Sequence, residues 1–152
     1  MKYYIAYGSN LSVTQMAHRC PDAVPVGTAA IEGWQLVFRH YATIERSQYA
    51  SVPVVVWRIT DRDERRLDRY EGFPRYYVKQ MFPVRVTALR TQETFDVEAM
   101  VYIMTPGRSP VIPPSMAYYD VIEDGYRHFD LDLCALRSAL DDAIYRVFGS
   151  DE

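Results

Sequence analysis

The order in which strand-like and helix-like segments follow one another constrains the fold of this chain most. Segments rich in β-branched and aromatic residues dominate the first two thirds of the sequence, and two helical segments close it. Most connections between the predicted strands are too short for helical crossovers, so neighbouring strands are expected to run mainly antiparallel. Strands followed by terminal helices are typical of an α+β protein, in which a mixed or antiparallel sheet curls, as in a small β-barrel, and helices flank it.

The predicted strands share alternating or continuous apolar residues. They span residues 2–7, 24–40, 52–57, 76–87 and 95–105. Gly33 interrupts the second segment, which is therefore either two strands or one strand with a bulge. The polar interval 47–51 predicts a connection before the third segment, whose nearly unbroken apolar run predicts a central strand.

Four helices are predicted from their capping and stop signals. They span residues 12–20, 61–71, 116–128 and 132–148. Ser12 with Gln15 forms a capping box at the first helix, and Asp61 with Glu64 has the same relation at the second. Gly72 follows the second helix at the position that favours left-handed backbone. The last helix carries an apolar stripe that is expected to face the core: Leu133, Leu136, Leu140, Ala143, Ile144 and Val147.

Composition limits the classes of partner and compartment. With 152 residues, 49% of them hydrophobic, residues 1–152 are expected to form a single domain with a substantial core. A net charge of −3 without a polybasic block gives nucleic acid or an anionic membrane nothing to attract it. Cys20 and Cys134 lie far apart with no histidine at metal-binding spacing, which predicts reduced thiols and no metal site. Without a signal or membrane-spanning pattern, a soluble cytoplasmic protein is expected.

The turn formed by residues 7–11, Tyr-Gly-Ser-Asn-Leu, is the first candidate site. It connects the first predicted strand to a capped helix, and Gly8 permits either a positive φ or the close approach of a ligand. Backbone N–H groups at such a turn are natural receptors for an anion or an oxyanion. The same pattern also occurs in turns without any function, so the turn alone does not define an activity.

Glu71 is the second candidate. It follows Leu67 by four residues and Glu64 by seven, so the last turn of its helix points a carboxyl group where an apolar side chain is expected. Burial and the negative end of the helix dipole would both raise the pKa of this carboxyl, unless Arg75 pairs with it. The alternative is an ordinary glutamate that faces solvent at a helix end.

Other catalytic patterns are weaker. Ser9 follows a glycine in a strand-to-helix turn, but the flanking sequence lacks a nucleophile elbow, and no histidine is marked as its base. Tyr102 lies on a strand face that changes from acidic to apolar, as expected of a residue that lines a cavity.

The loop and the glutamate belong to an ordered set of motifs that covers most of the chain. The set resembles the γ-glutamylcyclotransferase family and its AIG2-like relatives. Its members are Tyr7-Gly8-Ser9-Asn10-Leu11, Arg19-Cys20-Pro21, Leu67-Asp68-Arg69-Tyr70-Glu71-Gly72, Ala99-Met100-Val101-Tyr102 and Pro114-Ser115-Met116-Ala117-Tyr118.

The resemblance implies a small barrel with a cavity at one end, and an enzyme that releases 5-oxoproline from a γ-glutamyl amino acid or amine. It implies Glu71 as the catalytic acid and base, with no cofactor. The implied substrate-binding residues are Tyr7, Gly8, Ser9, Asn10 and Leu11 of the loop, with Tyr102 on a strand. The tyrosine that follows the Glu-Gly pair in the family corresponds here to Tyr76 or Tyr77.

Two points stay open at the level of sequence. A protein that binds γ-glutamyl or other carboxylate metabolites without turnover is the alternative, although a carboxylate facing an anionic ligand disfavours it. The leaving amine and the oligomeric state are not encoded in any recognised motif. Residues that contact the leaving amine are expected in the loops 39–51 and 105–114.

Overall fold

The computed structural model describes residues 2–107 and 109–149. Its elements, in chain order, are β1 (Lys2–Ala6), the short 3-10 helix η1 (Ser9–Leu11), α1 (Val13–Arg19), β2 (Val24–Arg39), β3 (Tyr41–Ile59), α2 (Asp61–Glu71), β4 (Tyr77–Ala88), β5 (Thr94–Met104), α3 (Met116–His128) and α4 (Cys134–Phe148). None of the helices in these two ranges is long and apolar enough to cross a membrane.

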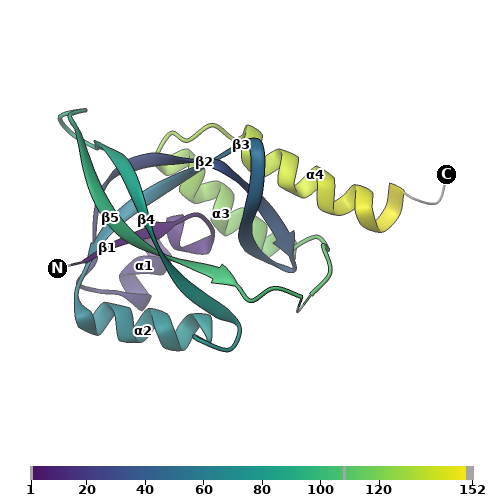
Figure 1. Ribbon diagram of the computed structural model, residues 1–152, viewed down its shortest axis with the longest axis horizontal. Helices are drawn as coiled ribbons and strands as arrows, with labels where there is room; N and C mark the ends of the chain where they lie inside the picture. Colours follow the sequence, from purple (N-terminus) through teal and green to yellow (C-terminus); the bar gives the residue numbers. More distant parts are fainter. Residues whose placement is uncertain (1, 108, 150–152) are drawn as a thin grey trace.

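The five strands form a closed barrel in the order β1-β3-β2-β4-β5. Two antiparallel hairpins, β2–β3 and β4–β5, make up most of the wall, and β1 pairs antiparallel with β3. A parallel contact between Tyr4 and Met100 joins β1 to β5 and closes the barrel. Helices lie around this barrel, with α4 running away from it toward the C-terminus (Figure 1). The α+β class and the mixed barrel expected from the sequence are thus confirmed.

The β2–β3 hairpin is longer than the sequence predicts. Residues 24–39 form one strand with a bulge at Gly33, whose φ is +81°, so the second of the two sequence interpretations is correct. The polar interval 47–51 is not a break, because it lies inside β3 and its end pairs with β2 through Ser51 and Glu32. Backbone pairs on both sides, Arg46 with Trp34 and Ser51 with Glu32, keep this part within the strand, and the side chains of residues 48 and 49 are exposed.

The N-cap of α2 lies one residue earlier than predicted. Thr60, not Asp61, is the N-cap, and its hydroxyl accepts a hydrogen bond from the Asp63 N–H. The Asp63 carboxylate in turn accepts from the Thr60 N–H, which completes a capping box that uses Asp63 in place of Glu64. Gly72 ends the helix with φ +66°, in the predicted left-handed conformation.

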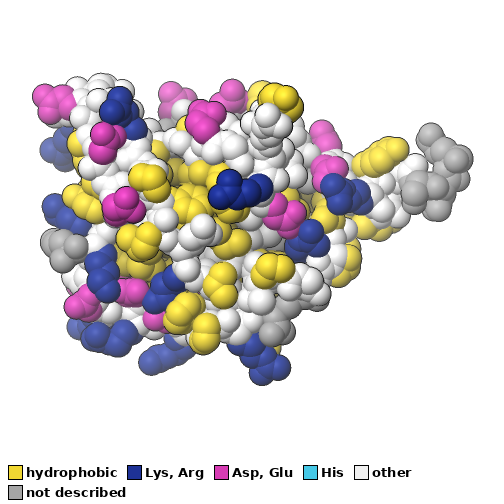
Figure 2. Space-filling view, viewed as in Figure 1, with side chains coloured by type: hydrophobic (Ala, Val, Ile, Leu, Met, Phe, Trp, Pro, Cys, Tyr) yellow, Lys and Arg dark blue, Asp and Glu magenta, His cyan; other side chains and the backbone are white. Residues whose placement is uncertain are grey.

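Two lysines attach α2 to the barrel. Lys2 of β1 contacts Glu64, and Lys79 of β4 contacts both Glu64 and Asp68, at 2.6 and 2.8 Å. Figure 2 shows the edge that contains α2 as an alternation of basic and acidic side chains. Because Lys79 and Glu64 are mostly buried, these ion pairs constrain the orientation of α2 more than exposed pairs would.

The two C-terminal helices pack differently from each other. Gly125 of α3 lies against Leu11 so closely that a Cβ placed there would be 2.4 Å from the Leu11 Cβ. In α4 the predicted stripe is only partly correct: Leu136 and Ala143 are buried and Leu133 and Leu140 are partly buried, whereas Ile144 and Val147 are exposed. The reason is that the last turns of α4 extend beyond the hairpin on which its first turns pack (Figure 1).

Replacing Gly125 with alanine is expected to destabilise the protein, although alanine is normally favoured over glycine inside a helix by about 1 kcal/mol. The added methyl group would overlap Leu11, and overpacking of this kind typically costs about 1 to 3 kcal/mol. Urea unfolding of Gly125→Ala gives the measurement. Asp124→Ala, at the exposed neighbouring position of α3, is the control and should change stability by less than about 0.5 kcal/mol. Equal or greater stability of the Gly125 variant would contradict the packing described here.

Candidate active site

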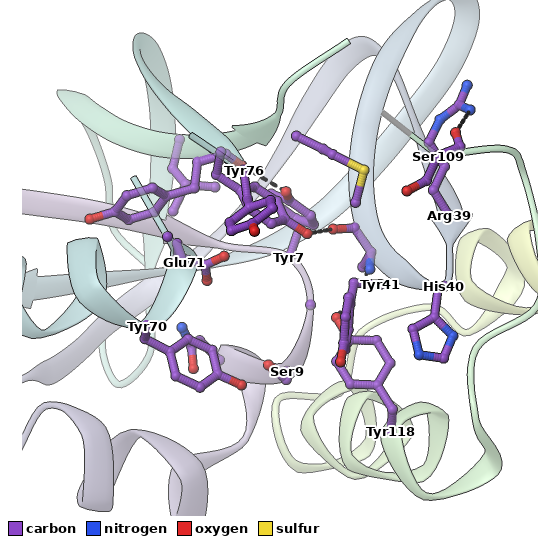
Figure 3. A pocket seen from close by; sticks show the side chains of 18 of the residues that line it. Tyr7, Ser9, Arg39, His40, Tyr41, Tyr70, Glu71, Tyr76, Ser109 and Tyr118 are labelled. Atoms are coloured by element: carbon purple, nitrogen blue, oxygen red, sulfur yellow. Dashed lines mark hydrogen bonds between the residues drawn. The ribbon is translucent and has the colours of Figure 1, made fainter. Parts of the chain in front are cut away.

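A cavity of about 700 Å³ opens at the end of the barrel where the turn after β1 meets the last turn of α2. Its walls also include residues of the β2–β3 turn, β4, β5 and α3. Elements from both halves of the sequence therefore contribute to one site. Tyrosines form much of the surface, and Glu71 is the carboxylate that lines it (Figure 3).

Glu71 is the last residue of α2 and points into this cavity. Leu67, one turn earlier on the same face, is fully buried, which directs the following carboxyl inward. Figure 3 shows the Glu71 carboxyl group in the space between Tyr7 and Tyr70. Glu71 is partly buried and lines the cavity, so the alternative of a glutamate that faces bulk solvent at a helix end does not describe this residue.

Burial raises the pKa of the Glu71 carboxyl to about 7, and the positive charge of Arg19 opposes this rise. Arg75, which would have opposed the rise had it paired with Glu71, instead places its guanidinium over the Tyr76 ring, 5.4 Å from the centroid. A carboxyl with a pKa near neutrality populates both protonation states at physiological pH. Glu71 can therefore accept a proton and return it under the same conditions.

Tyrosine rings surround the Glu71 carboxyl. Burial raises the pKa of Tyr7 and Tyr77 above the ordinary value, and the charge of Glu71 adds to the effect at both, after that of Tyr77 in the case of Tyr7. Burial likewise raises the pKa of Tyr4 and Tyr118, and the nearby charge of Glu71 adds to the effect. These hydroxyls stay protonated at neutral pH, so they act on a ligand as neutral hydrogen-bonding groups.

The turn after β1 presents its backbone to the cavity. Gly8 has φ −120°, so it does not use the left-handed conformation, and the other sequence interpretation, the close approach of a ligand, stays a prediction. A Cβ at this position would lie 3.3 Å from the Ala42 Cβ and 3.6 Å from the Tyr118 hydroxyl. The N–H groups of Leu11 and Ser12 bond to Gly8 and Ser9 carbonyls within the turn. Within residues 2–107 and 109–149, the N–H groups of residues 8–10 have no such partner.

Arg19, which the sequence analysis did not single out, holds the turn in place. Its guanidinium donates to Ser9 Oγ at 3.1 Å and to Asn10 Oδ1 at 2.6 Å, and also donates to the Tyr70 hydroxyl. The same guanidinium stacks 3.4 Å from the centroid of the Tyr70 ring. The Asn10 amide then donates to the Tyr4 hydroxyl at 3.0 Å. This network links the turn to the residue that precedes Glu71.

The Ser9 hydroxyl is an acceptor in this network. Its hydrogen bond comes from Arg19, and the described part of the chain shows no hydrogen bond between Ser9 and a histidine. A serine nucleophile needs an adjacent base, and arginine does not serve as one. The geometry therefore makes Ser9 part of the hydrogen-bonded turn after β1 and gives no support to a serine hydrolase.

Leu11 is placed differently from the prediction. Its side chain is fully buried beneath Gly125 of α3, and it is not part of the cavity wall. Its backbone N–H bonds to the Gly8 carbonyl at 3.0 Å. Leu11 thus anchors the turn in the core and does not contact the cavity.

The other predicted residues, Tyr7, Tyr77 and Tyr102, lie in the cavity wall. Tyr77 is 9% exposed and Tyr76 is 50% exposed; both line the cavity, Tyr77 deep within it and Tyr76 at its opening. The Tyr102 hydroxyl donates to Asp68 at 2.6 Å, and the Tyr102 carbonyl accepts from the Tyr7 hydroxyl at 2.6 Å. These bonds join β1, β5 and α2 around Glu71.

The outer part of the cavity combines residues from both predicted loops. Arg39 and His40, with Tyr41, come from the β2–β3 turn, and Ser109 comes from the segment after β5. The Arg39 guanidinium donates to the Ser109 carbonyl at 2.5 Å, which joins the two segments (Figure 3). The expectation of a loop over 39–51 is otherwise wrong, because β3 begins at Tyr41.

Three further cavity residues, Arg69, Tyr70 and Tyr118, were not predicted to form the site. All three lie inside motifs that carried the family resemblance, but a motif read alone does not show which of its side chains face a cavity. Arg69 and Tyr70 directly precede Glu71 in the last turn of α2. Only the packing of α3 on η1 brings Tyr118 to Gly8.

The five-stranded mixed barrel with four helices is a fold shared with gamma-glutamyl cyclotransferases. A solved structure of a gamma-glutamyl cyclotransferase matches it with a TM-score of 0.78 and 26% identity, over 91% of this chain and 85% of that chain. A gamma-glutamylcyclotransferase of Bos taurus is 33% identical over 143 residues, which span 86% of this chain and 72% of the relative. The corresponding Homo sapiens protein is 31% identical, with the same coverage.

The family model for gamma-glutamyl cyclotransferase, AIG2-like, matches residues 4–126. The chain belongs to this family. Family membership implies a small-molecule substrate, and the matched residues include the turn after β1, Glu71 and Tyr118.

The buried carboxyl predicts a specific dependence of stability on pH. Because the pKa of Glu71 is about 7 in the folded chain and near 4.5 when unfolded, the folded state holds more protons between these values. Glu71 therefore makes folding less favourable as the pH rises through this range, by up to about 3 kcal/mol. The stability of Glu71→Gln relative to the parent is expected to rise by about 2 to 3 kcal/mol between pH 5 and 8, measured by urea unfolding.

Glu64→Gln is the matched control from the same helix. Although burial alone would raise it, hydrogen bonds from Lys2 and Lys79 hold the pKa of Glu64 below its usual value. Ionised Glu64 therefore stabilises the folded state fully at pH values above its unfolded pKa, and this stabilisation is lost only at lower pH. The difference in unfolding free energy between Glu64→Gln and the parent should stay nearly constant from pH 5 to 8. A constant difference for the Glu71 variant as well would contradict a carboxyl of raised pKa.

Proposed function

We propose that this protein releases 5-oxoproline from a γ-glutamyl amino acid or γ-glutamyl amine. In this reaction the α-amine of the substrate attacks its own γ-carbonyl carbon, and the amine that was joined to this carbon departs. The observation that supports the proposal most is the position of Glu71, a carboxyl with a pKa of about 7, opposite the free N–H groups of the turn after β1.

Nucleophile and electrophile belong to the same molecule in such a substrate. Holding the γ-glutamyl chain in a folded conformation therefore supplies much of the advantage of proximity. No nucleophilic side chain is required, and the proposed mechanism uses no cofactor. The protein has to bind the folded chain, move protons and stabilise the negative charge that develops on the carbonyl oxygen.

In the proposed mechanism, Glu71 moves the protons. Its carboxylate takes a proton from the α-ammonium, which gives the free amine that attacks the γ-carbonyl. A carbon–nitrogen bond forms, the carbonyl becomes a tetrahedral oxyanion, and protonated Glu71 delivers a proton to the departing nitrogen as the second carbon–nitrogen bond breaks. The ring nitrogen then loses its second proton, which Glu71 takes and passes to the departed amine. The ammonium has then lost two protons, the departing amine has gained two, and Glu71 returns to its initial state.

The turn formed by residues 7–10 is proposed to bind the γ-glutamyl group. Backbone N–H groups of residues 8–10 have no partner within the described chain and lie at the cavity, where they can donate to substrate oxygen atoms. Arg19 keeps the turn rigid, and Tyr7, Tyr77 and Tyr102 shape the wall against which the substrate packs. Leu11 contributes by anchoring the turn and has no direct contact in this proposal.

The test is the substitution Glu71→Gln, which keeps the shape of the side chain and removes its capacity for proton transfer. The expected result is a fall in kcat of about 10² to 10⁴-fold, with the affinity for a γ-glutamyl dipeptide retained. Mass spectrometry of 5-oxoproline across γ-glutamyl conjugates that differ only in the amine gives turnover, and calorimetry gives affinity.

Glu98→Gln is the matched control, because Glu98 is an exposed glutamate of β5 outside the cavity. Its turnover should equal that of the parent. Unchanged turnover in Glu71→Gln would remove Glu71 from the mechanism. If the parent protein binds every conjugate and leaves all of them intact, it is a binding protein and the proposed reaction is wrong.

A further inference from the structure

The charged residues of α2 lie on two opposite sides of the helix. At 3.6 residues per turn its four arginines fall within an arc of about 100°, and its five acidic residues fall on the other side. Acidic and basic residues that alternate along the sequence are therefore separated in the folded chain. The arginines are Arg62, Arg65, Arg66 and Arg69, and the acidic residues are Asp61, Asp63, Glu64, Asp68 and Glu71.

The acidic residues of α2 are engaged within the molecule. Lys2 and Lys79 both contact Glu64, and each contacts one further carboxylate, Asp61 in the case of Lys2 and Asp68 in the case of Lys79. The two remaining acidic residues complete the capping box and line the cavity. The ion pairs of α2 with the barrel thus use its carboxylates and leave its arginines to solvent.

The arginine side of α2 is exposed and mostly unpaired. Arg62 reaches Asp22, with 3.5 Å between Nε and Oδ2. Over residues 2–107 and 109–149, the guanidinium groups of Arg65, Arg66 and Arg69 make no hydrogen bond or ion pair, and all three residues are exposed. Figure 2 shows basic side chains along the lower edge of the molecule, where α2 lies in Figure 1. This side of α2 is therefore a positively charged surface.

The positive surface leads to the opening of the cavity. Arg69 lines the cavity, and Arg65 and Arg66 lie about one helical turn further from it along α2. The other arginine among the described lining residues, Arg39, already contacts Glu45 at 2.7 Å and the Ser109 carbonyl at 2.5 Å. Arg69 is thus the lining arginine that can bind an anionic group of a ligand.

A ligand that fits both the cavity and this surface carries several negative charges in a row. In the proposed reaction the γ-glutamyl group occupies the cavity beside Glu71, so the departing amine extends toward the opening. An amine with a single carboxylate reaches Arg69 but does not extend along α2 to Arg65 and Arg66. A chain of glutamates joined through their γ-carboxyl groups has one α-carboxylate in every unit, and its first unit is a γ-glutamyl group with a free α-amine.

We propose that the substrate is an oligo-γ-glutamyl chain, whose first unit enters the cavity and whose following α-carboxylates bind to Arg69, Arg66 and Arg65. This inference rests on the function proposed above and names the substrate class. Guanidinium groups suit the role because they bind carboxylates through two parallel hydrogen bonds and stay charged at neutral pH. A surface of one sign beside a cavity also attracts a ligand of the opposite sign to the opening.

Each reaction cycle shortens the chain by one unit. The α-amine of the first unit forms a bond to its own γ-carbonyl carbon, and the amide bond from this carbon to the second unit breaks. The α-nitrogen of the second unit gains the protons that the first ammonium loses. The shortened chain again begins with a free α-amine, so it is a substrate for the next cycle. A tetramer therefore yields three molecules of 5-oxoproline and one glutamate, and no water is consumed.

The first test uses the parent protein with two ligands of equal length. One is the γ-linked glutamate tetramer, and the other is the same tetramer with every carboxylate after the first unit converted to a carboxamide. In about 20 mM salt, kcat/KM for the charged tetramer is expected to be about 10-fold higher. In about 0.5 M salt the ratio should fall below about threefold, because salt screens exposed charges. Equal kcat/KM for the two tetramers in low salt would overturn the proposal.

The second test removes two arginines that lie outside the cavity wall. Arg65→Gln/Arg66→Gln is expected to lower kcat/KM for the charged tetramer about 10-fold, mainly through KM, and to change that for the amidated tetramer less than about twofold. Arg90→Gln/Arg137→Gln is the matched control, because it removes two exposed arginines from the β4–β5 turn and from α4. It should leave both values unchanged. Equal losses for the charged tetramer in the two double variants would contradict binding at α2.

Turnover of γ-glutamylglycine separates this inference from the proposed reaction. If the parent releases 5-oxoproline from γ-glutamylglycine and from the charged tetramer with the same kcat/KM, the reaction stands and the inference is wrong. If neither is turned over, but calorimetry shows about 10-fold weaker binding of the charged tetramer by Arg65→Gln/Arg66→Gln, the reaction is wrong and the binding surface stands. Equal calorimetric affinity of the parent and this variant for the charged tetramer contradicts the inference whatever the turnover.

Discussion

The removal of the Glu71 carboxyl from water is the interaction on which the rest of the site depends. Burial raises its pKa to about 7, and Arg19 limits the rise. The destabilising effect of burying this group is tolerated because α2 is held to the barrel by its ion pairs with Lys2 and Lys79 and by the buried Leu67. These contacts of α2 thus hold the Glu71 carboxyl in a position that is unfavourable for a charged group.

Closure of the barrel brings the remaining parts of the site to this carboxyl. The parallel contact of β1 with β5 places the turn after β1 next to Tyr102, although about 95 residues separate them. The hydrogen bond from the Tyr7 hydroxyl to the Tyr102 carbonyl fastens the two strands at this point. The β2–β3 hairpin then supplies Ala42, to which β4 and α3 each attach a tyrosine. The cavity is a product of these long-range contacts, and none of its walls is formed by a single segment.

Local patterns were sufficient to predict most elements and two parts of the site. Periodicity and capping residues located β1, β4, β5 and the four helices, and the helical position of Glu71 relative to Leu67 predicted an inward carboxyl. Features that depend on distant residues were not predictable in the same way. The polar residues 47–51 lie within a strand because β2 pairs with Arg46 before them and with Ser51 at their end, and Leu11 lies away from the cavity because its side chain packs against Gly125. The hydrogen-bond partners of the cavity tyrosines also come from other elements, so the sequence could not show which acceptor each hydroxyl contacts.

The helix α3 carries two contacts with the turn after β1, and they are seven residues apart. Gly125 receives Leu11, and the Tyr118 hydroxyl faces Gly8, so both contacts lie on one face of the helix, two turns or about 10 Å from each other. Sliding or rotation of α3 would move both points together. The helix α3 therefore sets the distance between Leu11, which anchors the turn in the core, and Gly8, which lines the cavity.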